Sequence, residues 1–222
     1  MKKNYLDKPK SWTLGLLLLA SAARVAEAAT IVLDFEGVGD LAAVNDFYNG
    51  GTDSAGNSGS NFGISFSENS LGLIDSDAGG FGNFANEPSP DTILFFLGGG
   101  AATMNVAAGF STSFSFYYTS VNDPGIVTVY DGLNGTGNVL ATLNLPYLGG
   151  ACFGDPYGTN CNWSTVGVTF NGTARSVDFG GAADHIGFDN ITLGSMASVP
   201  IPPAAWLLGS ALVGLFGLSR RR

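Results

Sequence analysis

Glycine is dense in the middle of this chain and lysine is missing there, which argues against most helical folds. All but four of the 33 glycines lie between residues 29 and 196, and no lysine does. Each glycine costs a helix about 1 kcal/mol relative to alanine. The same stretch holds all but one of the 16 phenylalanines, which is too many for a disordered linker. Glycine-rich turns between aromatic strands predict an all-β domain.

Short segments in which apolar and polar residues alternate predict the individual strands. Two Asn-Gly pairs, at Asn134 and at Asn171, predict tight turns between neighbouring strands. One short helical turn is expected around 41–47. The expected fold is a β-sandwich or jelly roll of about ten short strands. The segments predicted as strands are 30–36, 62–67, 93–97, 113–119, 126–130, 139–145, 166–170, 174–179 and 186–193.

The N-terminus has the three parts of a secretory signal peptide in their usual order. Lysines at positions 2, 3, 8 and 10 are followed by an uncharged apolar run at 12–23. Ala26-Glu27-Ala28 then supplies the small residues of a cleavage site. We therefore expect residues 1–28 to be a signal peptide that is removed after Ala28.

The C-terminus predicts a membrane-spanning helix. Residues 199–218 contain no charge, and Arg220, Arg221 and Arg222 follow. Twenty helical residues span roughly 30 Å, the thickness of one hydrocarbon core. Terminal arginines favour the cytoplasmic side of the membrane. Residues 29–196 are therefore expected to form one domain outside the inner membrane, with 197–222 as its tail.

This tail resembles the PEP-CTERM sorting signal in its VPLPA-type variant. The family combines a short proline motif, here Val199, Pro200 and Pro202, with an apolar helix and a basic end. This chain has Val-Pro-Ile-Pro where the name-giving form has Pro-Glu-Pro. The resemblance implies processing by an exosortase-like protease in a bacterium that makes exopolysaccharide. It implies a precursor anchored in the inner membrane and a product at the cell envelope surface or outside the cell.

The charge of the domain restricts its partners. Residues 29–196 contain sixteen acidic residues and a single basic one, Arg175, which gives a formal net charge of −15. Binding to nucleic acid requires cationic groups that replace the counterions of phosphate, and this domain lacks them. Anionic lipid surfaces are excluded on the same ground. Divalent cations and neutral glycans remain plausible partners.

Cys152 and Cys161 are the only cysteines of the chain. An exported protein meets an oxidising compartment, so we expect them to form a disulfide. The loop that they close would be worth roughly 2.5–3 kcal/mol in the chain-entropy model. A metal site is the weaker alternative, because no second thiol pair or nearby histidine is present.

The sequence offers little catalytic chemistry. His185 is the only histidine, and no G-x-S-x-G motif or phosphate-binding glycine loop is present. Among sixteen acids, some carboxylate pairs are expected by chance. The interpretation is therefore an exported, non-catalytic surface or matrix protein that associates with exopolysaccharide. A secreted glycan-active enzyme with paired carboxylates and a structural adhesin are the alternatives.

Calcium is the cofactor that the sequence best supports. Calcium takes oxygen ligands from carboxylates, amides and backbone carbonyls. Asp34 and Glu36 are predicted on one face of the first strand, and Asp189 and Asn190 lie in the last. The two segments resemble the two ends of calcium-holding jelly-roll modules of the carbohydrate-binding type. Glu36 and Asp189 are the leading candidate ligands, and solvated acids at strand edges are the alternative.

Overall fold

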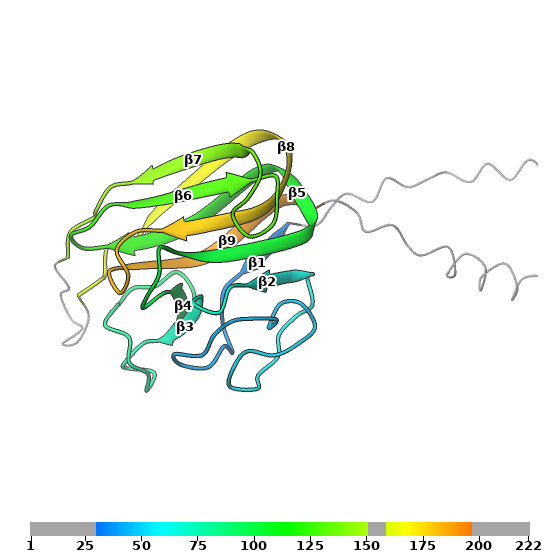
Figure 1. Cartoon of the computed structure of the whole chain (residues 1–222). Helices are drawn as coiled ribbons and strands as arrows, with labels where there is room; N and C mark the ends of the chain where they lie inside the picture. The colour runs from blue at the N-terminus through cyan, green and yellow to red at the C-terminus, as the bar shows by residue number, and fades with distance from the viewer. Residues whose placement is uncertain (1–29, 151–158, 197–222) are drawn as a thin grey trace, which may run out of the picture.

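A computed structural model describes residues 30–150 and 159–196 and shows an all-β architecture (Figure 1). The predicted signal peptide, the sorting tail and Cys152 lie outside these ranges. Hydrogen bonds connect nine strands, and the described ranges contain no helix. The strands are β1 (Ile31–Leu33), β2 (Ile64–Phe66), β3 (Leu71–Ile74), β4 (Thr92–Phe95), β5 (Ala101–Ser120), β6 (Gly125–Tyr130), β7 (Val139–Leu145), β8 (Ser164–Gly180) and β9 (Ile186–Met196).

A long ribbon of β5 and β8 organises the fold. The two strands pair antiparallel almost end to end, from Ala101 opposite Gly180 to Tyr118 opposite Ser164. Near its middle the register shifts, once between Asn105 and Phe110 and again two residues later. Such bulges bend a ribbon and increase its twist. The ribbon therefore folds over on itself, and its two halves belong to different layers.

The bend depends on unusual backbone conformations. Gly109 and Thr112 have φ values of 77° and 75°, in the left-handed region that favours glycine. A side chain at Gly109 would also collide with Thr173 on the opposite strand. Gly172 has φ 100° on β8 at the same place. The Asn171-Gly172 pair thus lies in the bend of one continuous strand, and the prediction of a turn between two separate strands was wrong.

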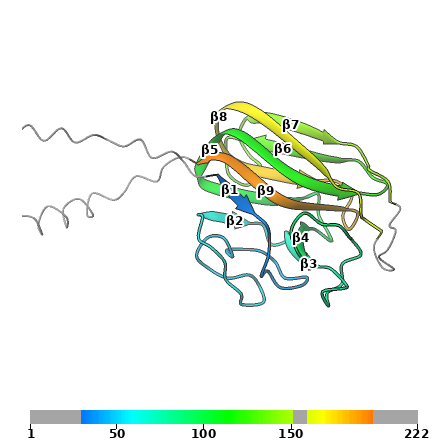
Figure 2. The same cartoon turned by 180° about the vertical axis from the view of Figure 1, so that it is seen from behind.

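The remaining strands extend the two layers, which are visible in both views (Figures 1 and 2). β6 pairs with the second half of β8, β7 continues beyond β6, and β2 pairs with the first half of β5. In the other layer β9 pairs with the second half of β5, and β1 and β4 lie along its other edge. β3 pairs with β4. Strand pairing thus brings the two ends of the domain sequence together on β1 and β9.

Aromatic side chains fill the space between the layers. Phe179 of β8 contacts Phe188 of β9, with ring centroids 5.0 Å apart, and also Phe116 and Phe114 of β5. All four rings are at most 1% exposed. Edge-to-face and tilted pairs of this kind add about 0.5–1.5 kcal/mol each beyond their buried area. The phenylalanines that argued against disorder therefore build the central core.

Irregular segments before β2 and between β3 and β4 cover one side of the sandwich. Phe35, Tyr48 and Phe66 form an aromatic group there. A separate small core of Leu73, Phe84, Ile93 and Phe95 lies under the β3–β4 pair. Residues 41–47 form turns, so the helical turn expected there is absent. The described ranges also contain no helix long and apolar enough to cross a bilayer.

The two ends of the sandwich differ. The domain starts and finishes near the bend, because Ile31 pairs with Leu193 and Met196 pairs with Phe110. At the opposite end the ribbon is open, and the loops that follow β5, β7 and β8 come together. We call this the open end. Any ligand site at the open end lies on the side of the domain away from its termini.

Candidate functional site

The carboxylate of Asp189 is buried beside the end of β1. Its side chain is completely inaccessible, and both carboxylate oxygens accept hydrogen bonds from Ser89, the Oγ at 2.9 Å and the backbone N–H at 2.8 Å. The Ser89 hydroxyl also lies 3.0 Å from the carbonyl oxygen of Asp34 and 3.3 Å from that of Thr92. We call these groups the Ser89 cluster.

The Ser89 cluster holds more acceptors than its hydroxyl can satisfy. Four oxygens surround the Ser89 Oγ, two from Asp189 and one each from Asp34 and Thr92. A hydroxyl has one hydrogen to donate. Converging carboxylate and carbonyl oxygens are the ligand types that calcium prefers. The oxygen atoms of the Ser89 cluster are therefore of the type that binds a hard cation such as calcium.

Electrostatics at Asp189 reflect this crowding. The pKa of the Asp189 carboxyl is raised to about 6, mainly by burial and in smaller part by the nearby charge of Glu36, although the hydrogen bonds from Ser89 and Asn190 oppose the rise. The neighbouring Tyr48 also has a raised pKa, because of burial and the charge of Asp34. A cation in the Ser89 cluster would favour the ionised form of Asp189.

The other predicted ligands lie close by in different roles. Glu36 accepts hydrogen bonds from the backbone N–H groups of Asp91 and Thr92 at 3.0 and 2.9 Å. Asp34 turns its backbone oxygen to Ser89, while its carboxylate accepts from the Glu36 N–H and the Tyr48 hydroxyl. Asn190 donates its backbone N–H to Asp189. The structure thus brings both predicted segments together, with Asp34 contributing its backbone oxygen.

Backbone conformation explains why simple alternation does not describe Asp34 and Glu36. β1 ends at Leu33, and the buried Phe35 has φ 61°. Asn190 beside it has φ 47°. A bulky residue in the left-handed region is uncommon and persists only when its surroundings impose it. Both strands therefore deform where the Ser89 cluster forms. Among the described residues, no group of three or more His, Cys, Asp or Glu side chains is arranged to hold a metal.

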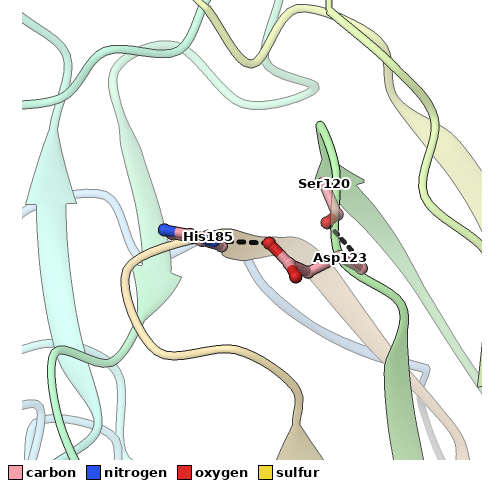
Figure 3. Close-up of polar contacts among 3 residues, drawn as sticks. All are labelled: Ser120, Asp123 and His185. Atoms are coloured by element: carbon pink, nitrogen blue, oxygen red, sulfur yellow. Dashed lines mark hydrogen bonds and ion pairs between the residues drawn. The ribbon is translucent and has the colours of Figure 1, made fainter.

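His185 contacts the carboxylate of Asp123 but is not hydrogen-bonded to a nucleophilic side chain among the described residues. His185 Nδ1 lies 2.5 Å from a carboxylate oxygen of Asp123 (Figure 3). The nearby Ser120 is fully buried and donates its hydroxyl to the backbone oxygen of Asp123, away from the histidine. A catalytic serine needs its hydroxyl bonded to the histidine. This arrangement instead ties the β5–β6 loop to the β8–β9 loop.

Beside this ion pair, the loops of the open end surround a hollow of about 520 Å³. We call it the open-end hollow. Backbone hydrogen bonds connect the loops around it. The N–H groups of Thr159 and Asn160 donate to the carbonyl oxygen of Asn83, and the N–H group of Asp184 donates to the carbonyl oxygen of Phe96. Its described polar lining consists of Asn83, Asn122, Thr159, Asn160, Asp184 and His185.

Sequence reasoning missed most of these residues. Ser89 lies 100 positions from Asp189 in the chain, in a segment without regular structure, and nothing in its surroundings marks it as a partner. The hollow draws on four separate loops, so no local motif could reveal it. Asp75, an acid in a glycine-rich segment that the sequence did not mark as buried, is 2% exposed. Cys161 is mostly buried and is not a free thiol. Its pairing with Cys152 stays a prediction.

No protein-family model and no curated protein sequence matches this chain. Among solved structures, the K2 cleaved adhesin domain of Lys-gingipain is similar over 74% of this chain and 99% of its own, with a TM-score of 0.47 and 12% identity. The K1 adhesin domain of Lys-gingipain from Porphyromonas gingivalis has a TM-score of 0.42 and 13% identity, and the match covers 75% of this chain and 98% of that domain. A carbohydrate-binding module of Cellvibrio mixtus lichenase 5A, solved with cellotriose, has a TM-score of 0.33 and 18% identity, and the match covers 56% of this chain and 86% of that module. The function has to be inferred from the residues of this chain.

Proposed function

We propose that this chain is an exported, non-catalytic protein of the bacterial cell surface or matrix, and that it associates with exopolysaccharide. The observation that carries the proposal is the open-end hollow. Amide and hydroxyl side chains line it, and no lysine or arginine does so among the described residues. Sugar hydroxyls both donate and accept hydrogen bonds, and amides such as Asn83 and Asn122 complement them.

The ends of the sequence supply the cellular part of the proposal. Residues 1–28 read as a signal peptide, and residues 197–222 resemble a sorting tail that an exosortase-like protease processes. Met196 lies near the bend, at the opposite end from the hollow. A domain held at its C-terminus would therefore present the open-end hollow to the outside. We also propose that the two-layered β fold is a jelly roll, as the sequence predicted.

Co-sedimentation with the exopolysaccharide of the producing bacterium tests the association. The exported protein should pellet with the purified polymer at physiological salt and stay in solution without it. Its negative charge makes nonspecific attraction to an anionic polymer unfavourable, so binding should persist as the salt concentration is varied. Failure of the protein to pellet with the polymer would refute the proposed association.

We also propose that calcium binds at the Ser89 cluster, with Asp189 and the backbone oxygens of Asp34 and Thr92 as ligands and Glu36 completing the site. A divalent ion would neutralise the buried carboxylate of Asp189 and relieve its repulsion from Glu36. It would also reduce the self-repulsion of a strongly acidic domain. Calcium would then serve stability and shape, through ligands that do not line the open-end hollow.

Thermal unfolding tests the calcium site. At constant ionic strength, calcium at a hundredfold excess over Kd should stabilise the exported protein by about 2.7 kcal/mol relative to chelator. Glu36→Gln should lose most of this gain and still fold, because its amide oxygen can accept both hydrogen bonds that Glu36 accepts through a single oxygen. Asp46→Asn, at an exposed turn, is the matched control and should keep it. Equal unfolding temperatures in calcium and chelator would rule the site out.

One observation favours glycan hydrolysis as a second candidate function. Burial raises the pKa of the Glu87 carboxyl to about 7, and the charges of Asp75, Asp77 and Asp91 add to the rise. Glycosidases pair a protonated carboxylic acid with an ionised one. Glu87 does not line the open-end hollow. Release of reducing sugar from the polymer, lost in Glu87→Gln, would establish this alternative.

A further inference from the structure

A small space lies next to the open-end hollow. This space, which we call the throat, has a volume of about 20 Å³. About 10–15 Å³ accommodates one water molecule, so the throat admits a single small group. Five of its eleven lining residues have apolar side chains, among them Phe84, Ile93 and Phe95. Asn83, Asn160, Asp184 and His185 line both spaces, which places the throat next to the hollow.

Two residues that line the throat each carry a buried polar atom that lacks a hydrogen-bond partner within the described part of the chain. These atoms are the Oγ1 of Thr119, whose side chain is 2% exposed, and the Oδ1 of Asn160. Leaving such a group unsatisfied costs about 1–3 kcal/mol. A hydroxyl in the throat could donate to Asn160 and accept from Thr119. The throat thus has the size and the polarity of a site for one hydroxyl on a small carbon stem.

Charge around the hollow selects against anions. Asp184 lines it, Asp123 lies beside it, and Arg175 is the only basic residue in residues 29–196 other than the histidine. A carboxylate on the ligand would lose its hydration and meet these acids without a cation to compensate. A neutral ligand therefore fits the hollow better than a uronic acid or a sulfated sugar.

We propose that the open-end hollow binds one neutral hexose unit of a glycan and that its hydroxymethyl group enters the throat. This assignment rests on the proposed association with polysaccharide and specifies its chemistry. Asn160 accepts the proton of the primary hydroxyl, and Thr119 donates to its oxygen. Asn122 lines the hollow, where its amide can meet the ring hydroxyls, and does not line the throat. A pentose, which lacks the hydroxymethyl group, leaves the throat unfilled.

Binding of simple glycosides to the exported protein tests the assignment. Titrations followed by NMR compare the methyl glycosides of glucose, galactose and mannose with those of xylose and glucuronic acid. At least one hexoside should bind about tenfold more tightly than the xyloside and the glucuronide, since one hydrogen-bonding group is worth about that factor. Thr119→Val should lower hexoside affinity about tenfold. Its unfolding temperature should not fall, because the Thr119 hydroxyl has no partner in the structure to lose.

Thr142→Val on the exposed face of β7 is the matched control and should bind like the original protein. Equal binding of xyloside and hexoside, no binding of any hexoside, or an unchanged affinity in Thr119→Val would overturn the assignment. Co-sedimentation separates the two levels of the proposal. If the exopolysaccharide pellets the original protein and Thr119→Val equally well, the throat is wrong while the association stands. If it pellets neither, the association itself is wrong.

Discussion

Buried acids in this protein have few positive charges to compensate them. Asp189 and Glu87 both have raised pKa values, about 6 and about 7, and burial is the main cause in each. Asp53 shows the opposite outcome. Burial alone would raise its pKa, yet hydrogen bonds from Gly39, Asn57 and Ala55 hold it below the usual value. Local donors therefore decide which acids the fold tolerates in ionised form.

The raised pKa of Glu87 predicts a protein that is more stable in mild acid than at neutral pH. The folded state holds the proton more tightly than the unfolded state, in which the pKa is about 4.5. The stabilisation is complete below pH 4.5 and is lost as the pH rises through 7. In chelator, the unfolding temperature should fall by roughly 2–4 °C between pH 5 and pH 8.

The variant Glu87→Gln isolates this effect in the same thermal scans. It should unfold at a higher temperature than the original protein at pH 8 and should show a smaller fall between the two pH values. We attribute the fall in unfolding temperature that remains in Glu87→Gln to Asp189, the other acid with a raised pKa. Glu68→Gln removes an equal charge at an exposed position and should keep the full dependence. Identical pH profiles for Glu87→Gln and the original protein would show that Glu87 titrates normally.

At the scale of the elements, the sequence predicted those strands and turns that have a clear local pattern and missed those that do not. The segment 139–145 was predicted with the observed bounds of β7, and Asn134-Gly135 has positive φ at both residues, as a hairpin turn requires. The first half of β5 was missed, because its alanines and short polar residues carry no aromatic alternation. β3 was missed because four residues are too few to show a period.

The candidate site was predictable only where it depends on strand order. The prediction named Glu36 near the first strand and Asp189 in the last strand as ligands of one site, and β1 does pair with β9. Ser89, Thr119 and Asn160 could not be found in this way. Ser89 reaches Asp189, and Thr119 and Asn160 come to line the throat, through loop paths and the folding of the ribbon, which depend on long-range packing. A sequence pattern reports only the neighbours of a residue within its own element.

Packing between the layers predicts a large effect for one phenylalanine and none for another. Phe179→Ala should destabilise the protein by about 3–5 kcal/mol, because the ring is fully buried among Phe114, Phe116 and Phe188. Phe81→Ala should change stability by less than about 0.5 kcal/mol, since that ring is 80% exposed. Denaturant unfolding of both variants measures the difference. A cost below about 1 kcal/mol for Phe179→Ala would contradict the two-layered core.

At the scale of the whole molecule, the proposed attachment and the proposed recognition involve opposite ends of the domain. The domain begins and ends at the bend of the ribbon, and the hollow lies at the open end. The Ser89 cluster connects β1, β9 and the segment before β4. A cation there would hold the layer that carries the termini, without contact to the hollow. One small domain can thus be anchored, stabilised and exposed to a polymer at separate places.

The location and the ends of the protein in its producing bacterium test the central claim most directly. The cells are compared with a strain that cannot make exopolysaccharide, and the protein is recovered from matrix and medium for mass spectrometry. The account predicts a form that starts near Ala29 and lacks Arg222, held in the matrix of the parent strain and released into the medium without the polymer. An intact Met1, or the same distribution in both strains, would contradict it.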